Sequence, residues 1–531
     1  MRKLITILII LICTIFSLKG QNFNLTNERT FELLYINKLD TAANFHSAIK
    51  PFNRAETEVI FNYDSTMAKL KIGNEGSFIN ELTSQHLVGI NKKFKLFINP
   101  IINGIATTES NNNFSKTVIE KSGGLSLKTA YSKKWSAEWD FLYDNSEYVF
   151  HVDALVQQHN ISPGYGYSDN NQSIFSQGNI TFTADENFTF QAGYGKHFIG
   201  DGYRSLFLSD NANSYPYLKV TANIWKIKYM ALYSVHDDIR FSNGNYGDYQ
   251  QKFTTTHYLS LNATKWLNIG FFESIVFQAQ EGDFYRGFEM AYLNPIIFLR
   301  SVEFAQGSGD NALMGGSIKL RIFKKNILYS QFLFDEFLLD ELKAGNGWWA
   351  NKYGIQVGLK MIDFLTIKNL RFQAEYNEVR PFTYSYFYKN TSISTLQNYG
   401  HFNAALAHPL GANFKEVTLS LAYQKKRWII EAFSTIAKVG FDTNATTSIG
   451  QDIYRPYNNR ERDYGYYTTN GLVTDIINST LKVSYIINPK SQMLLQVGVT
   501  NRMVTNQFMD NSTNMFFVGL KTAITNRYFD F

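Results

Sequence analysis

One short stretch brings together the residue types that enzymes use in hydrolysis. It reads GYGKHFIGDGYRSLFLSDNANSYPYLKV over residues 193–220, and its His197, Asp201 and Ser209 could supply a base, an orienting carboxylate and a nucleophile. Such a triad is recognised by geometry, and nothing in the sequence marks Ser209 as an activated nucleophile. Because Ser, His and Asp occur together in many polar loops, the pattern does not favour an enzyme.

Nucleotide and metal chemistry fit this region no better. The glycines of GYGKHFIGDG do not open a helix within a βαβ unit, and the residue order of a phosphate-binding P-loop is missing. The VHDD stretch at 235–238 offers an incomplete ligand set, and strand alternation would direct its side chains to opposite faces. We therefore expect no catalytic residue, no cofactor and no metal site.

A structural interpretation suits the same stretch better. Gly200 and Gly202 would allow the backbone to turn without a Cβ penalty. Lys196, Asp201 and Arg204 would then be charges that need partners, either one another or charges on a neighbouring wall. The strands that could carry such partner charges have to be found in the rest of the chain.

Residues 1–20 are typical of a secretory signal peptide. Two basic residues precede an apolar run over 4–16, and Gly20 follows at the expected cleavage point. The run is too short for a good membrane span, and Cys13, the only cysteine, lies inside it. We expect export, removal of this segment and a mature chain without disulfides.

The remaining sequence is aromatic and carries no long apolar segment. Phe, Tyr and Trp make up 16% of the chain, whereas the net charge is only +6 over 531 residues. That charge is too small to indicate nucleic-acid binding. After the signal segment, no run reaches the roughly eighteen apolar residues of a transmembrane helix. The composition therefore argues against a helical membrane protein and a nucleic-acid-binding protein.

Apolar and polar residues alternate along most of the chain. The alternating segments include residues 124–131, 135–141, 355–361, 370–377, 417–424 and 481–485. In 370–377, for example, Arg371, Gln373 and Glu375 share one face and apolar side chains share the other. A charged face opposite an apolar face with aromatic ends is typical of a membrane β-barrel. A soluble β-sandwich is the alternative that alternation leaves open.

We predict an all-β, outer-membrane antiparallel barrel of about 16 to 20 strands, at roughly ten residues per strand. Residues 21–55 do not alternate and are expected to form a periplasmic helical extension or plug, with the barrel and its loops over 56–531. The chain ends in Phe529 and Phe531. We expect them on an alternating last strand, where a final aromatic residue resembles the signal read by the outer-membrane assembly machinery.

Connection lengths predict the orientation of the barrel. Short connections at 132–135, 184–187, 323–326, 424–427 and 488–491 alternate with long ones at 143–177, 197–216, 336–351, 378–414, 437–477 and 501–513. In outer-membrane barrels the short turns face the periplasm and the long loops face outward. The stretch 193–220 is therefore expected to be an outer loop, or a loop that folds from that side into the lumen.

Five stretches resemble one family of outer-membrane proteins. They are FHSAIKPFNRAE (45–56), ISPGYGYS (161–168), GKHFIGDGYRSLFLSDNANSYPYLKV (195–220), AYLNPIIFLRSVEF (291–304) and YGHFNAALAHPLGANFKE (399–416). In this order they resemble Wzi-like capsule-assembly outer-membrane proteins. GKHFIGDGYRSL and AHPLGANF are most similar to the gliding-motility outer-membrane proteins of that group. KHFIGDGY replaces the tryptophan-rich first loop of the capsule proteins, so their capsule-binding residues are not carried over.

The resemblance implies a barrel in the outer membrane of a Gram-negative bacterium, with loops that close the pore. It implies a non-enzymatic role in surface polysaccharide assembly or attachment, or in gliding-type motility. The implied partners are outer-membrane lipid, surface polysaccharide, and motility or export components. The signature residues in the loops are Lys196, His197, Gly200, Asp201, Gly202, Arg204, Ser209, Asn211, His401, His408, Pro409, Gly411 and Asn413.

Two other loops are the best candidates for contacting a saccharide. NGWWANKYG at 346–354 and NNRERDYGYYTTN at 458–470 combine aromatic ring faces with donors and acceptors that suit sugar hydroxyls. The residues concerned are Trp348, Trp349, Arg460, Arg462, Tyr464 and Tyr466. The alternative is that these are interfacial girdle residues and solvated loop tips. The alternative function is a passive outer-membrane pore.

Overall fold

The structure is a computed structural model. It describes residues 22–531 apart from 75, 92–93, 112–113, 133, 243, 282–283, 286, 297–308, 388–394 and 445. The predicted signal peptide, residues 1–20, lies outside the described residues. Within the described part of the chain, no helix is long and apolar enough to cross a membrane.

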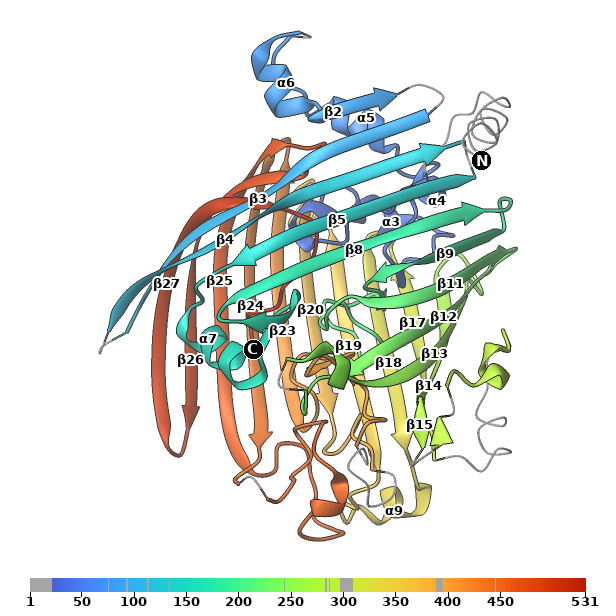
Figure 1. Cartoon of the computed structure of the whole chain (residues 1–531), viewed down its shortest axis with the longest axis vertical. Helices are drawn as coiled ribbons and strands as arrows, with labels where there is room; N and C mark the ends of the chain where they lie inside the picture. The colour runs from blue at the N-terminus through green and yellow to red at the C-terminus, as the bar shows by residue number, and fades with distance from the viewer. Residues whose placement is uncertain are drawn as a thin grey trace.

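In the part of the chain that the structure describes, 18 antiparallel strands form a closed barrel (Figure 1). In chain order they are β3 (Phe94–Ser110), β4 (Ser115–Tyr131), β5 (Trp135–Asn145), β8 (Gln172–Thr183), β9 (Phe188–Gly195), β11 (Tyr215–Ile224), β12 (Ile227–Asp238), β13 (Gln250–Leu261), β14 (Leu267–Gln278), β17 (Asn311–Ile322), β18 (Asn326–Glu336), β19 (Lys352–Ile362), β20 (Leu370–Val379), β23 (Phe414–Lys425), β24 (Trp428–Phe441), β25 (Leu472–Asn488), β26 (Met493–Asn506) and β27 (Met509–Thr522). Pairing of β27 with β3 closes the ring. The predicted outer-membrane β-barrel and its range of strand numbers are confirmed.

Side-chain alternation determines the two faces of the wall. On β25, Leu481 is 51% exposed on the outside, whereas its neighbours Thr480 and Lys482 line an internal cavity. On β20, Arg371 faces inward to Asp40 of the N-terminal part, with 2.9 Å between Nη2 and Oδ2. The apolar exterior and charged interior confirm the barrel over the soluble sandwich.

The long connections gather at one end of the barrel. All the long loops lie at the lower end in Figure 1, together with the short connections β3–β4 and β26–β27, and the other short turns lie at the upper end. The long loops are residues 146–171, 196–214, 239–249, 279–310, 337–351, 380–413 and 442–471. The long loops 239–249 and 279–310 were not predicted from the sequence.

The predicted long loop over 501–513 is wrong. β26 continues to Asn506 and β27 begins at Met509, so Gln507 and Phe508 alone connect them. The stretch is rich in Asn, Asp and Ser, which are typical loop residues. Polar side chains near a strand end, away from the membrane centre, do not prevent backbone pairing. For this reason the ends of β26 and β27 could not be predicted from the polar composition of the stretch.

The N-terminal part is helical and lies at the short-turn end. It comprises α2 (Arg29–Glu32), α3 (Ile36–Thr41), β1 (Ile49–Lys50), α4 (Arg54–Thr57), α5 (Tyr63–Ala68), α6 (Phe78–Ser84) and β2 (Val88–Asn91). Its helices continue beyond residue 55, the boundary expected from the sequence. Phe31, Leu39 and Phe61 pack against Ile429 and Ile486 of the barrel wall. The N-terminal part up to Leu70 therefore occupies the lumen at this end.

The last residues leave the wall and enter the lumen. β27 ends at Thr522, and residues 523–531, here called the C-terminal segment, turn inward. The Tyr528 hydroxyl donates to Asp210 over 2.7 Å, and Asp530 Oδ2 lies 2.9 Å from Arg204 Nη2. The prediction that Phe529 and Phe531 lie on the last strand is wrong, because β27 ends at Thr522 and the neighbouring Tyr528 and Asp530 have partners inside the barrel.

Candidate functional site

Four of the five family-like stretches meet inside the barrel. β10 (Phe198–Ile199) pairs with β1, which places Ile199 opposite Ile49. Lys196 Nζ donates to Gly164 O over 2.6 Å, and Ser209 Oγ donates to Leu406 O over 3.2 Å. These contacts join the stretches at 45–56, 161–168, 195–220 and 399–416, which are far apart in the sequence.

The remaining stretch, 291–304, lies mostly outside the described residues. Its described beginning belongs to the short helix η2 (Met290–Leu293). There Tyr292 packs on Phe277, with 4.8 Å between ring centroids, in a cluster separate from the lumen core. The described residues of this stretch, 291–296, therefore lie outside the lumen core.

We call residues 196–214 and 380–413 the lumen loops. Arg204 is the central charge of the first lumen loop and is 1% exposed. Its Nη2 lies 3.0 Å from Glu416 Oε1 on β23 and 2.9 Å from Asp530 Oδ2 in the C-terminal segment. A buried guanidinium between two carboxylates ties the loop, the wall and the C-terminal segment together.

Gly202 lets the backbone approach the wall beside this arginine. The amide groups of Tyr203 and Arg204 donate to the Glu375 carboxylate over 2.7 and 2.9 Å. A Cβ at position 202 would collide with that carboxylate, so only glycine fits here. Gly200, with φ of +154°, donates its amide to Ala48 O of the N-terminal part over 2.7 Å. The predicted role of both glycines in shaping the turn fits these contacts.

In the described structure Asp201 pairs with the wall and not with Arg204. Its carboxylate lies 3.4 Å from Lys319 Nζ on β17 and accepts a hydrogen bond from Ser47. Burial by itself raises the pKa of the Asp201 carboxyl, but the ammonium groups of Lys319 and Lys360 outweigh burial and hold that pKa below its usual range. Asp201 is therefore a charged anchor of the loop.

His197, Asp201 and Ser209 have separate partners among the described residues. His197 Nδ1 lies 3.3 Å from the Tyr215 hydroxyl, and burial lowers the pKa of His197 well below its usual value. The Ser209 hydroxyl donates to backbone carbonyls of the second lumen loop, as does the Asn211 amide, to Ala405 O over 3.1 Å. Each group serves loop docking in this arrangement.

The second lumen loop is held in the same way. His401 accepts from the Asp237 amide over 2.9 Å and donates to Ser214 O over 3.1 Å. His408 Nδ1 accepts from the Leu410 amide, so Nε2 carries the proton and donates to Glu416 over 2.8 Å. The loop then passes half-buried Pro409 and turns at Gly411, where φ is +70°.

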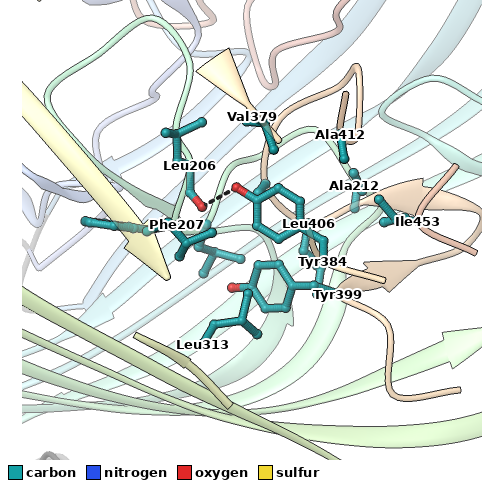
Figure 2. Packing of buried hydrophobic residues seen from close by; sticks show 14 of the residues in the cluster. Leu206, Phe207, Ala212, Leu313, Val379, Tyr384, Tyr399, Leu406, Ala412 and Ile453 are labelled. Carbon is teal, nitrogen blue, oxygen red and sulfur yellow. Dashed lines mark hydrogen bonds between the residues drawn. The ribbon is translucent and has the colours of Figure 1, made fainter. Parts of the chain in front are cut away.

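Apolar side chains of both lumen loops fill the barrel between these polar contacts. Figure 2 shows Leu206 and Phe207 of the first loop packed with Tyr384 and Leu406 of the second and with Leu313 of the wall. The Tyr384 hydroxyl donates to Leu206 O over 2.8 Å. The described loops therefore form a core inside the barrel.

A cavity remains between this core and the N-terminal part. It measures about 370 Å³ and is bounded by the wall, the N-terminal part and the C-terminal segment. Charges of both signs line it, including Arg29, Glu120, Lys360 and Arg527. Arg527 Nη1 lies 2.8 Å from Glu120 Oε2. This mixed lining does not favour ions of one sign.

Two further loops, 337–351 and 442–471, interlock at the long-loop end, and we call them the surface loops. The Trp349 amide donates to Asp463 O over 2.9 Å, and the Tyr466 amide donates to Gly347 O over 2.8 Å. The structure thus brings together the two candidate saccharide-binding stretches, 346–354 and 458–470.

The predicted saccharide-contacting residues differ in accessibility. Tyr464 is 48% exposed, Arg462 is exposed, and Trp348 and Trp349 are half-buried. The Arg460 guanidinium lies 4.1 Å from the Trp349 ring centroid. Tyr466 is only 1% exposed and supports the loops from below, so it is not on the contact surface.

Two functional residues of this region were not predicted from the sequence. Tyr467 is 51% exposed beside Tyr464, and the repeated aromatic residues of YGYY could have indicated it. Arg380 lies beneath both surface loops and donates to Asn351 O, Trp348 O and Tyr466 O over 2.9, 3.2 and 2.9 Å. No sequence signal distinguishes Arg380 from other loop arginines.

Comparison with known proteins shows the fold. No protein-family model and no curated protein matches this sequence. Among solved structures, the chain matches Wzi of Escherichia coli with a TM-score of 0.56 and 11% identity, over 95% of this chain and 99% of that chain. The chain has a Wzi-like fold. Wzi is reported as a carbohydrate-binding outer-membrane β-barrel involved in group 1 capsule assembly.

Other outer-membrane barrels match more weakly. Pseudomonas aeruginosa OpdL gives a TM-score of 0.41 at 10% identity, over 80% of this chain and 98% of that chain. Acinetobacter baumannii OccAB4 gives 0.42 at 9% identity, over 81% and 98%. At 11% identity, the similarity to Wzi shows the fold alone. This fold is that of Gram-negative outer-membrane proteins.

Proposed function

We propose that this barrel attaches or organises polysaccharide at the cell surface without catalysing a reaction. The polysaccharide would belong to a capsule or exopolysaccharide, or would serve gliding-type surface motility, as the sequence resemblance suggests. The Wzi-like fold supports the proposal, since Wzi is a carbohydrate-binding barrel. The observation that carries it is the interlocked pair of surface loops, with Trp348, Tyr464 and Tyr467 on one accessible region.

The surface loops have the properties that saccharide binding requires. Half-buried and exposed aromatic rings offer apolar faces, and Arg460, Arg462 and Asp463 lie beside them with hydrogen-bonding groups. Backbone hydrogen bonds between the loops and three donors from Arg380 hold the surface in place. A surface ordered before binding loses less conformational entropy when the ligand arrives.

A passive pore is the competing function. A pore requires an open aqueous path, whereas the described lumen loops pack Leu206, Phe207 and Leu406 into a core inside the barrel. Displacing the first loop would also separate Arg204 from Glu416 and Asp530. We therefore expect the wild-type protein to conduct poorly in planar bilayers.

Alanine substitutions in the surface loops test the proposal. Trp348→Ala with Tyr464→Ala should weaken binding of the purified barrel to polysaccharide extracted from the producing bacterium by about tenfold, or ~1.4 kcal/mol. Cells that carry this variant should also retain less surface polysaccharide. The control is Trp225→Ala, which changes a tryptophan 85% exposed in a turn at the opposite end.

Three outcomes distinguish the functions. Loss of binding in the surface-loop variant alone supports the proposal. Equal binding by the wild type, the double variant and the control overturns the assignment of this surface. High wild-type conductance together with no polysaccharide binding would instead favour the passive pore.

A further inference from the structure

A small helix and strand project at the rim of the short-turn end, at the top of Figure 1. We call residues 77–90 the rim segment. It contains α6 and most of β2, and β2 continues the sheet beside the first half of β3, with Val88 opposite Ile98 and Ile90 opposite Leu96. The rim segment is therefore joined to the wall but lies outside the ring of 18 strands.

In α6, the helix of the rim segment, polar residues are buried and apolar residues are exposed. Asn80 and Ser84 are each 2% exposed and face the protein, whereas Phe78 is 78%, Ile79 56% and Leu82 62% exposed. Residues four apart share a helix face, and a step of two residues turns by roughly 200°. Asn80 and Ser84 are thus inside, whereas the three apolar residues are outside, together with exposed Glu81. A surface helix of a soluble protein shows the opposite arrangement.

Hydrogen bonds from two short turns hold this orientation. Asn488 Nδ2, at the β25–β26 turn, donates to Leu82 O and Gln85 O over 2.9 and 2.8 Å. Arg427, at the β23–β24 turn, donates to Ser84 Oγ over 3.2 Å. Because the backbone and polar face are tied to the wall, the apolar face points away from it.

The rim segment lies next to the aromatic girdle of the barrel. Trp428 and Tyr485 form an outward-facing pair on β24 and β25, with 4.8 Å between ring centroids. Such pairs mark the boundary between membrane and water. Exposed Leu87, Val88 and Ile90 continue the apolar surface from α6 toward the outer face of β3. The apolar face of the helix is therefore continuous with the lipid-facing surface.

We propose that the rim segment lies at the membrane interface and that its apolar face contacts phospholipid. Phe78, Ile79 and Leu82 insert into the leaflet at the short-turn end, which is the periplasmic leaflet in the predicted orientation. An in-plane helix of this kind places its apolar side at the boundary of headgroups and acyl chains. In water the same face would be an exposed patch prone to association. This proposal is independent of polysaccharide binding.

Single cysteine variants test where the helix lies. Phe78→Cys, Ile79→Cys and Leu82→Cys would each be made in a Cys13→Ser background, so that no other thiol exists in the chain. Each barrel would be spin-labelled and reconstituted in vesicles of phosphatidylethanolamine and phosphatidylglycerol. Collision with oxygen reports lipid exposure, and collision with a water-soluble nickel chelate reports water exposure. Heat resistance of the barrel confirms folding of each variant.

Two matched positions calibrate the measurement. Leu495→Cys, 48% exposed on the outside of β26, represents a lipid-facing residue. Val59→Cys, 98% exposed after α4, represents a water-facing residue of the N-terminal part. Labels at 78, 79 and 82 should match position 495, with an oxygen-to-nickel ratio several-fold above that at position 59.

Ratios at 78, 79 and 82 equal to that at position 59 would overturn the proposal. The same holds if these labels are water-exposed in vesicles but shielded from both reagents in native outer membranes. That result would mean that another protein, and not lipid, covers the helix.

Discussion

The lumen loops and the surface loops start from the same end of the barrel but use their residues in opposite ways. The lumen loops contain His197, Asp201 and Ser209, which could do chemistry, and bury each one against its own partner. The surface loops expose Tyr464 and Tyr467 and leave their ring faces accessible. In the described lumen loops these three residues therefore hold the fold, whereas the accessible aromatic residues of the surface loops indicate a binding surface.

The two sets of loops are also physically connected. Arg380 begins the second lumen loop and donates hydrogen bonds to both surface loops. Asn413 ends the same lumen loop and donates to Gly440 O and Asn470 O over 2.7 and 2.8 Å. The two ends of the second lumen loop thus hold the surface loops in position through hydrogen bonds.

The largest effect is expected from Arg204→Ala. The change removes the counter-charge of buried Glu416 and of half-buried Asp530, and breaking a buried pair such as Arg204–Glu416 costs about 3–5 kcal/mol. We expect the first lumen loop to detach and the single-channel conductance in planar bilayers to rise. The wall should remain heat-resistant, because its strand pairing does not include Arg204.

Arg462→Ala is the matched control, since Arg462 is exposed on a surface loop. This variant should keep the wild-type conductance. A rise in conductance for Arg462→Ala but not for Arg204→Ala would reverse the assigned roles of the two sets of loops.

Arg380→Met should have a smaller effect, concentrated in the surface loops. It removes three hydrogen bonds from a charged donor, each worth about 1.5–3 kcal/mol at most, while it keeps much of the side-chain volume. Amide hydrogen exchange should accelerate in residues 346–351 and 463–467, and polysaccharide binding should fall. Exchange in residues 196–214 should change little.

Lys438→Met provides the comparison, because the ion pair of Lys438 with Asp475 is exposed and pairs of that kind contribute little. Faster exchange in the first lumen loop of Arg380→Met, with unchanged surface loops, would show that Arg380 supports the core and not the binding surface.

The smallest effect concerns acid. Since the folded-state pKa of Asp201 is below its usual value, its pairing stabilises the loop above the unfolded pKa of about 3.9. This stabilisation is lost as pH falls through the folded pKa. Conductance should therefore rise modestly below about pH 4. Asp201→Asn should remove this part of the pH dependence. The control Glu461→Gln, at an exposed position, should preserve it. Identical conductance–pH profiles for the wild type and Asp201→Asn would exclude Asp201 as the responsible group.

The amino-acid sequence determined the wall of this protein. Alternation over segments such as 370–377 and 417–424 is a local property, because successive side chains of a strand face lipid and lumen in turn. Short polar turns likewise depend on a few neighbouring residues, so the positions of most hairpins and the grouping of the long loops follow from the sequence. The resemblance in five stretches anticipated the Wzi-like fold.

Only the tertiary structure decided what fills and covers that wall. Arg204 meets Glu416 across 212 positions and Asp530 across 326, and no local pattern specifies such partners. The inward turn of residues 523–531, the burial of Tyr466 and the place of Arg380 depend on the same long-range contacts. Strand faces arise from neighbours in the chain, whereas lumen contacts arise when closure of the barrel brings distant charges into one space shielded from water.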